Sequence, residues 1–404
     1  MIAIWHAGSV IIGVLILTGL VSISIACLCT WWHFTKTTLP VLTEPAPKVS
    51  LLKPVESIEP KTYEAFASFC RVDYPGGMEL IVGTIHPNDV VVALVGRLRR
   101  EFPARDIRLV FAELKGANRK TSIMEAMRLK ATGQFLFFSD ADIVARKDYL
   151  RQLVPRLAQP GVGCVTCLPR GINTSTAGGK MIALHFAFNF FPQWMLAQRT
   201  TGIHWAVGAT MAVPRGVLEQ LGGFNQFLNH LADDYELGNR VSQLGLRVIL
   251  PPLLVDCEMP PESFGKSFVR MQRWKCTIRR SRGPQFLGVI LTYPVFWALI
   301  LVLIQPLAWW SWSTLGLVLA IRWLLAAGTQ VRIKLPDWPR AWWLLPVVDL
   351  VEGITFFGAF FGKTIFWAGR RYLLLRDGTL ELAASEAPLT KSDPVAASRN
   401  QIRR

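Results

Sequence analysis

Long apolar runs lie toward both ends of the chain and frame a middle part in which apolar and polar segments alternate. Residues 10–32 carry no charged side chain and are long enough to span a bilayer as one helix. Residues 286–308 and 309–328 predict two more membrane helices, the second carrying Arg322. Residues 341–368 are apolar and aromatic but contain Asp349, Glu352 and Lys363. One span there would also place the basic segment "GRRYLLLR" outside, against the positive-inside rule. We therefore expect a re-entrant or interfacial hairpin instead of a further span.

The middle part, residues 49–283, has the pattern of an α/β domain. Short apolar runs predict strands at 49–54, 78–85, 107–114, 134–140 and 161–168, separated by helix-like stretches at 61–71, 91–102, 120–131 and 149–157. This alternation predicts a mostly parallel sheet covered by helices on both faces. Ligands of such sheets bind beyond the carboxyl ends of the strands. The residues that directly follow each run are therefore candidates for a site.

These patterns divide the chain into five parts. They are an N-terminal transmembrane helix (1–36), a linker (37–48), a cytoplasmic domain (49–283), C-terminal transmembrane or interfacial helices (284–369) and a basic, partly disordered tail (370–404). No basic segment precedes the first apolar run and Lys36 follows it, which favours a retained anchor over a signal peptide. By the positive-inside rule the N-terminus then lies outside and the domain in the cytoplasm.

Composition and charge fit a membrane protein with a water-facing part. Hydrophobic residues make up 51% of the chain, and 44 Lys and Arg against 28 Asp and Glu leave a net charge of +16. Such a balance suits anionic lipid headgroups or a phosphorylated substrate. Nucleic acid is the competing partner, but the chain has no recognised nucleic-acid-binding motif. We expect a lipid bilayer as a partner and no nucleic acid.

Three groups of residues carry candidate chemistry, and each also has a structural explanation. Asp140 and Asp142 follow the apolar run "FLFF" and can hold Mg²⁺ or Mn²⁺ through oxygen ligands, although a capped turn would look the same. The acids of "LADDYELG" include Asp234 and stand at a predicted helix start, where acids often serve as caps. "RMQRW" carries Arg273 just before the membrane helices, and a basic helix on the membrane surface is its alternative. All three in this order form a rare combination.

Together these segments resemble glycosyltransferase family 21, the ceramide glucosyltransferases and their hopanoid-associated bacterial relatives. The resemblance runs from about residue 49 to residue 280. "VSLLKPV" resembles the family's first strand, "GANRK" its lysine-bearing loop, "FSDADI" its second aspartate motif, "LADDY" its third and "RMQRW" its (Q/R)xxRW motif. The first aspartate motif departs from the family pattern, because "HPNDVVVA" keeps only Asp89, with His86 and Asn88 in place of acids.

The resemblance implies a nucleotide-diphospho-sugar transferase fold of the GT-A type and a role for each matched residue. The implied site has Asp234 as the catalytic residue, Asp89, Lys120, Asp140, Arg270, Arg273 and Trp274 as substrate-binding residues, and Asp140 and Asp142 as metal ligands. Asp234 would act as general base on the acceptor hydroxyl. Direct displacement assisted by one base implies inversion.

Substrates and location also follow from the resemblance as expectations. We expect a divalent metal, Mg²⁺ or Mn²⁺, a UDP-sugar donor, either UDP-glucose or UDP-N-acetylglucosamine, and a lipid acceptor such as ceramide or a hopanoid. The bacterial relatives imply the inner membrane. A processive polysaccharide synthase and a non-catalytic membrane protein with a degenerate transferase domain remain alternatives. His185, His204 and His230 have no paired partners in the sequence and are predicted to be structural.

Overall fold

The middle part of the chain folds around a seven-stranded sheet with strand order β3-β2-β1-β4-β8-β6-β9. The computed structural model describes residues 2–35, 41–42, 44–87, 89–367 and 369–383. Strands β3, β2, β1 and β4 are mutually parallel, and β6 pairs in parallel with β9. Only β8 runs against its neighbours β4 and β6. The predicted α/β fold with a mostly parallel sheet is confirmed.

The strands of the large sheet are short. They are β1 (Val49–Pro54), β2 (Met78–Thr84), β3 (Asp106–Phe111), β4 (Phe135–Phe138), β6 (Val162–Thr166), β8 (Met211–Pro214) and β9 (Arg247–Ile249). A second sheet joins β5 (Ile143–Val144), β10 (Leu254–Glu258) and β7 (Leu168–Ile172). The run 161–168, predicted as one strand, is thus divided between β6 of the first sheet and β7 of the second.

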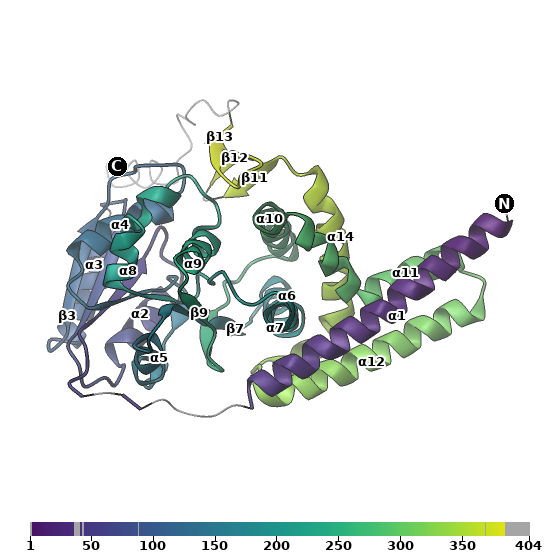
Figure 1. The fold of residues 1–404 in the computed structure, drawn as a ribbon, viewed down its shortest axis with the longest axis horizontal. Helices are drawn as coiled ribbons and strands as arrows, with labels where there is room; N and C mark the ends of the chain where they lie inside the picture. The colour runs from purple at the N-terminus through teal and green to yellow at the C-terminus, as the bar shows by residue number, and fades with distance from the viewer. Residues whose placement is uncertain (1, 36–40, 43, 88, 368, 384–404) are drawn as a thin grey trace, which may run out of the picture.

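Helices cover the large sheet and continue into the apolar segments (Figure 1). Around the sheet lie α2 (Thr62–Cys70), α3 (Asp89–Glu101), α4 (Arg119–Lys130), α5 (Tyr149–Leu157), α8 (Arg215–Gln220) and α9 (Asp233–Gln243). Beside them lie α6 (Ala177–His185), the π-helix η1 (Phe186–Phe190), α7 (Phe191–Thr200), the short 3₁₀ turn η2 (Gly223–Phe227) and α10 (Phe264–Arg282). Strands β1 and β4 are buried along their whole length, as their apolar sequences require.

The apolar ends of the chain meet in an elongated arm. Helices α1 (Ile2–His33), α11 (Pro294–Ile304) and α12 (Trp309–Ile333) lie side by side there (Figure 1). In the described part of the chain, three helices are long and apolar enough to cross a membrane, namely Gly8–His33, Trp309–Ile333 and Trp338–Phe361. The last comprises α13 (Trp338–Ala341), the 3₁₀ turn η4 (Trp342–Leu344) and α14 (Leu345–Phe361).

Two predicted membrane segments differ from the structure. Residues 286–308 are not one helix, because the 3₁₀ segment η3 (Gly283–Thr292) ends before Pro294 and the chain bends there by 64°. Proline fixes its own φ and cannot donate a helical hydrogen bond. Residues 345–361 form the single helix α14 instead of a hairpin. Its Asp349 and Glu352 are paired within the protein, so their charges do not exclude a buried helix.

A third small sheet closes the described part of the chain. Strands β11 (Thr364–Trp367), β12 (Arg370–Leu374) and β13 (Leu380–Leu382) are antiparallel. The backbone N–H of Leu380 donates to the carbonyl of Asn229 over 2.7 Å, and that of Leu231 donates to the Gly378 carbonyl over 3.2 Å. The first part of the predicted tail is therefore folded against the loop that precedes Asp233. Residues 384–404, which include most of that tail, lie outside the described residues.

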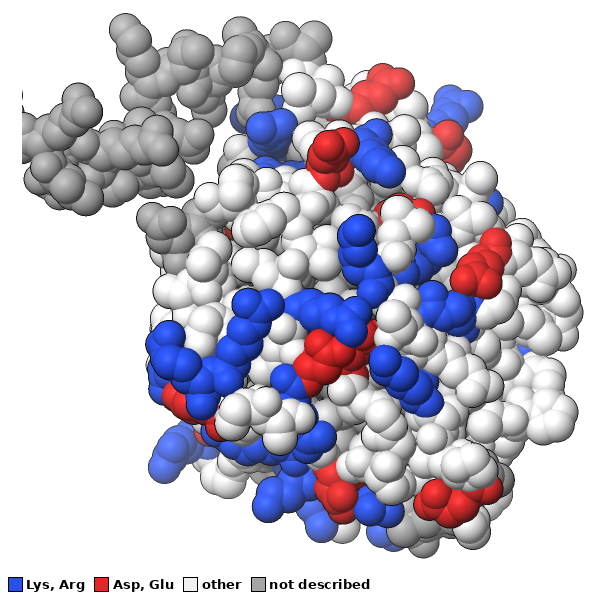
Figure 2. All heavy atoms as spheres, turned by 90° about the vertical axis from the view of Figure 1, so that its left-hand side faces the viewer, with Lys and Arg blue, Asp and Glu red and all other residues white. Residues whose placement is uncertain are grey.

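Basic residues are spread over the face farthest from the arm. Figure 2 shows this face, on which Lys and Arg side chains surround smaller groups of Asp and Glu. Helix α3 and strand β3 lie on this side of the molecule (Figure 1). Ion pairs such as Arg97–Glu101 at 2.8 Å belong to these elements and are exposed. Much of the basic character therefore faces water, away from the apolar helices.

Candidate active site

A cavity of about 1240 Å³ opens beyond the carboxyl end of β4 and brings the predicted motifs together. Asp140 and Asp142 follow β4, Lys120 comes from the first turn of α4, and Asp234 from the first turn of α9. All four side chains line this cavity, as does Arg273 of α10. The end of a parallel strand and two helix starts therefore meet where such sheets bind their ligands.

Lys120 connects the acids at the polar end of the cavity. Its Nζ lies 2.7 Å from Oδ1 of Asp140 and 3.2 Å from Oδ2 of Asp233. Burial would lower the pKa of Lys120, but the surrounding carboxylates of Asp140, Asp233 and Asp234 outweigh burial and raise it. Lys120 thus stays a cation and can also meet a phosphate oxygen.

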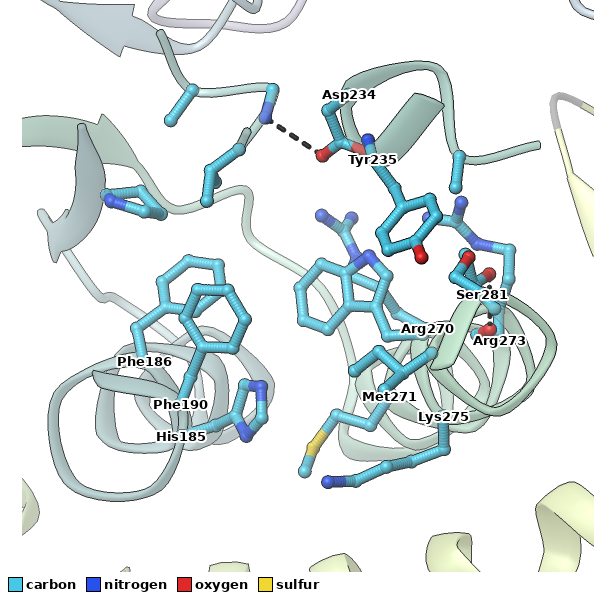
Figure 3. A pocket seen from close by; sticks show the side chains of 18 of the residues that line it. His185, Phe186, Phe190, Asp234, Tyr235, Arg270, Met271, Arg273, Lys275 and Ser281 are labelled. Carbon is cyan, nitrogen blue, oxygen red and sulfur yellow. Dashed lines mark hydrogen bonds between the residues drawn. The ribbon is translucent and has the colours of Figure 1, made fainter. Parts of the chain in front are cut away.

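Asp234 is held by backbone groups at the start of α9. Its Oδ2 accepts from the backbone N–H of Gly208 over 3.0 Å, the dashed line in Figure 3, and its Oδ1 accepts from Tyr235 N–H over 2.8 Å. Burial, followed by the neighbouring charge of Asp233, raises the pKa of Asp234 to about 6. A carboxylate with such a pKa is ionised at neutral pH and is a stronger base than an ordinary aspartate.

A fully buried lysine supports the turn that carries Asp140 and Asp142. Lys53 is the residue before the last one of β1. Its Nζ donates to the carbonyl of Asp140 and to that of Ile143, and the second bond is 3.2 Å long. The same ammonium lies 4.3 Å from the ring centroid of Phe69. Burial and Asp140 together raise the pKa of the Asp142 carboxyl to about 6. Lys53 thus holds the backbone of the turn, while the side chains of Asp140 and Asp142 line the cavity.

The arginines and tryptophan of the last motif lie on α10, opposite the wall formed by α6 and η1 (Figure 3). Arg270 pairs with Glu262 at 2.8 Å, and Arg273 lines the cavity. The Trp274 ring stacks on His185 with centroids 5.7 Å apart. Residues three or four positions apart share one face of a helix, which is why Arg270, Arg273 and Trp274 all reach the cavity.

Comparison with known proteins identifies the family. The model of the family described as Glycosyl transferase family 21 matches residues 14–380. The chain belongs to this family. The resemblance inferred from the aspartate and (Q/R)xxRW motifs is thereby confirmed, and the match extends into the apolar segments on both sides of the sheet domain.

Curated relatives of this family 21 chain are distant. A beta-monoglucosyldiacylglycerol synthase from Synechocystis sp. is 25% identical over 329 residues, covering 79% of this chain and 64% of that protein. Ceramide glucosyltransferase 3 from Caenorhabditis elegans is 24% identical over 203 residues, covering 50% of this chain and 44% of that protein. The chain thus spans less than two thirds of the length of these relatives.

Solved structures are also distant. The mannosyltransferase PcManGT from Pyrobaculum calidifontis, in complex with GDP-Man and Mn²⁺, has a TM-score of 0.49 and 21% identity, covering 85% of this chain and 99% of that one. Glucosyl-3-phosphoglycerate synthase from M. tuberculosis has a TM-score of 0.37 and 15% identity, covering 59% of this chain and 81% of that one.

The altered first motif of this family 21 member is described only in part. Asp89 begins helix α3, but its side chain and the whole of Asn88 lie outside the described part of the structure. A substrate-binding role for Asp89 therefore stays a prediction. His86 contacts the guanidinium of Arg119, the residue before Lys120. The loop that carries the altered motif is thereby connected to the lysine-bearing loop.

Lys53, beside the aspartate turn, is a residue that the sequence did not single out, and the structure also places Gly208 and His185 at the cavity. Lys53 had a signal, since a lysine inside an otherwise apolar parallel strand needs buried partners. Gly208 lies so close to the acids that a Cβ there would stand 3.1 Å from both Asp140 Oδ2 and Lys120 Nζ. His185 lines the cavity as well. Its partner Glu352 is far away in the sequence, so no local pattern pointed to it.

Asp140 and Asp142 stay the predicted metal ligands. Among the described residues no group of three or more His, Cys, Asp or Glu side chains is arranged to hold a metal ion. Asp140 is 38% exposed toward the cavity, and Asp142 lines the same cavity. Carboxylate oxygens are hard ligands of the kind Mg²⁺ and Mn²⁺ prefer, and such ions often take their remaining ligands from substrate phosphates and water. The residues present therefore fit a cation shared with a diphosphate.

Proposed function

We propose that the chain is a membrane-bound inverting glycosyltransferase. It transfers a hexose from a UDP-sugar, UDP-glucose or UDP-N-acetylglucosamine, to a hydroxyl of a membrane lipid such as ceramide or a hopanoid, forming a β-glycosidic bond. The observation that carries this proposal is one cavity with two chemically different ends. Lys120, Asp140 and Asp234 line its polar end, and Phe186, Phe190 and other aromatic residues line its apolar wall.

The polar end suits departure of a nucleoside diphosphate. Lys120 and Arg273 face the cavity and supply cationic donors for diphosphate oxygens, where negative charge develops as the sugar leaves. Arg270 adds a guanidinium oriented by Glu262. Asp140 and Asp142 would hold a divalent cation, which supplies further positive charge for the leaving group.

Asp234 is the proposed general base. Backbone donors from Gly208 and Tyr235 orient its carboxylate, and its pKa of about 6 leaves it ionised at neutral pH. It would take the proton from the acceptor hydroxyl as the oxygen attacks the anomeric carbon. One displacement inverts the configuration, so an α-linked donor gives a β-linked product.

The apolar end suits a lipid that enters from the bilayer. Phe186 and Phe190 of η1 and Trp194 of α7 line the cavity, and α7 packs against α1 of the arm. Such a wall would cover hydrocarbon while the acceptor hydroxyl reaches Asp234. We propose that the arm lies in the membrane with the sheet domain on the cytoplasmic side. The names of the two relatives, which describe glucosyl transfer to diacylglycerol and to ceramide, support a lipid acceptor.

The test is transfer of label from a sugar nucleotide to lipid. Membranes containing the full chain are incubated with radiolabelled UDP-glucose or UDP-N-acetylglucosamine and Mg²⁺ or Mn²⁺, and the lipid extract is analysed by chromatography and mass spectrometry. We expect label in one lipid fraction with wild type and with the surface variant Asp106→Asn. With Asp234→Asn we expect the rate to fall by about 10²–10⁴.

Three outcomes would contradict the proposal. Equal lipid labelling by wild type and Asp234→Asn, or no labelling above membranes without the chain, would remove the enzymatic assignment. Label in a long polymer would instead favour a processive polysaccharide synthase.

A further inference from the structure

A buried polar cluster lies in the wall of the cavity, apart from Asp234. His185 of α6 has its Nδ1 2.5 Å from Oε1 of Glu352. Oε2 of the same carboxylate lies 2.6 Å from Lys275 Nζ and accepts from the Tyr293 hydroxyl over 3.0 Å. Glu352 is 0% exposed. Figure 3 shows His185 and Lys275 on facing helices, with Asp234 at the other end of the view.

The charges in this cluster favour a proton on Nδ1 of His185. Lys275 and Glu352 form a buried pair of opposite charge, which is neutral in sum. A second positive charge beside it would have no further carboxylate among the groups that contact the cluster, and an uncompensated buried charge is costly. A neutral imidazole with its proton on Nδ1, 2.5 Å from Glu352 Oε1, adds no charge beside this pair. It leaves Nε2 with an unshared lone pair, because a neutral histidine has one donor and one acceptor nitrogen.

That lone pair has no protein partner among the described residues, although His185 lines the cavity. Its neighbours are apolar or aromatic: the rings of Phe186, Phe190 and Trp274 lie with centroids 5.7, 5.9 and 5.7 Å from the His185 ring. A hydrogen-bond acceptor in an apolar wall is stabilised by a ligand that brings a donor. Hydrocarbon alone brings none.

We propose that the His185–Glu352–Lys275–Tyr293 cluster is a second subsite for the acceptor lipid. There Nε2 of His185 accepts a hydrogen bond from a lipid hydroxyl or amide N–H other than the hydroxyl that is glycosylated. This inference rests on the proposed function, in which the cavity binds a lipid acceptor. It narrows the acceptor to lipids whose polar end carries at least two hydrogen-bond donors. Ceramide and a hopanoid with two or more hydroxyls qualify. Diacylglycerol does not, because its only donor is the hydroxyl that would receive the sugar.

Two substitutions of His185 separate this role from a purely structural one. In His185→Asn the side-chain amide stands close to the place of Nδ1, so it keeps a donor for Glu352 but removes the acceptor at Nε2. In His185→Gln the amide reaches the place of Nε2 and keeps an acceptor facing the cavity. His204→Asn is the matched control, because His204 is exposed and its Nε2 bonds to the Thr201 carbonyl.

The experiment measures lipid binding without sugar transfer. The purified full chain, in detergent micelles, is mixed with equal amounts of ceramide, a dihydroxylated hopanoid and diacylglycerol, and the lipids that co-purify are quantified by mass spectrometry. We expect wild type and His204→Asn to enrich one of the two-donor lipids over diacylglycerol by about tenfold, the effect of one buried hydrogen bond. His185→Gln should keep most of this enrichment, and His185→Asn should reduce it to about twofold or less.

Several results would overturn the inference. One is that wild type enriches no two-donor lipid over diacylglycerol, and another is that His185→Asn keeps the enrichment. A greater loss of enrichment in His185→Gln than in His185→Asn would also count against it, because that order is expected if the histidine only supports Glu352. Absence of sugar transfer in the same preparations would count against the proposed function alone, because enrichment is read before any donor is added.

Discussion

Replacing Asp233 by Asn should move the acid limb of the activity profile to lower pH. Burial and then the charge of Asp233 raise the pKa of Asp234 to about 6. The proposed base works only as a carboxylate, so kcat/KM should rise with pH through this value and level off above about pH 7. At pH 5 about one tenth of the molecules would carry an ionised base.

The size of the shift follows from the two causes. The substitution removes the like charge, but burial of Asp234 remains, so the pKa should fall by about one unit without returning to the ordinary aspartate value. Loss of the 3.2 Å contact between Asp233 and Lys120 acts in the same direction, because the ammonium is then shared among fewer carboxylates. At pH 5 the ionised fraction would rise from about a tenth to about a half, roughly a fivefold gain relative to the plateau.

The assay is the rate of lipid glycosylation between pH 4.5 and 8 at constant ionic strength, with each profile normalised to its own plateau. Normalisation separates the shift from any general loss of activity in the variant. Asp106→Asn is the control, because Asp106 is an exposed acid of β3 that pairs with Arg108. An acid limb that stays in place or moves upward in Asp233→Asn would refute the assignment of that limb to Asp234.

Three further substitutions test other parts of the structure. Lys53→Met removes the ammonium that donates to the carbonyls of the aspartate turn. It should raise KM for the sugar nucleotide about tenfold with little change in thermal stability. An unchanged KM would contradict the positioning role of Lys53. Gly208→Ala introduces a Cβ at 3.1 Å from both Asp140 and Lys120 and should lower kcat/KM by about tenfold or more, whereas Gly216→Ala, which meets nothing within 4 Å, should not. Asp349→Ala leaves buried Arg322 without its carboxylate and should destabilise the protein by about 3–5 kcal/mol, measured by thermal unfolding in detergent. The double variant with Arg322→Met should be more stable than the single one, and equal stability would argue against the pair.

Local sequence patterns were sufficient to predict the strand before Asp140 and the motif on α10. The apolar run before Asp140 had to be a buried strand, and its carboxyl end then had to point to the ligand edge of the sheet. The motif "RMQRW", placed just before the apolar segments, likewise pointed to Arg270, Arg273 and Trp274. The break of residues 286–308 also had a local signal in Pro294, since proline interrupts a helix from within.

What escaped prediction depends on pairs that are distant in the sequence. Arg322 and Asp349 pair between α12 and α14, and Lys275 and Glu352 pair between α10 and α14. Before the partners were known, the acids of residues 341–368 argued against a buried helix. Once they are paired, the same acids stabilise one. His185 looked structural for the same reason, because Glu352 becomes its neighbour only in the folded chain.

The two acids of α14 connect the apolar helices to the walls of the cavity. Asp349 accepts from Asn189 of η1 over 3.0 Å and from Arg322, and Arg322 also donates to the Phe188 carbonyl over 2.9 Å. A π-helical turn such as η1 is rare and frequently lies at functional sites, and here buried side chains hold it. Three residues further along the same face, Glu352 holds Lys275 of α10. Helix α14 therefore fixes both the wall with Phe186 and Phe190 and the wall with Trp274. Substitutions in α14 should alter the choice of acceptor more strongly than the binding of the sugar nucleotide.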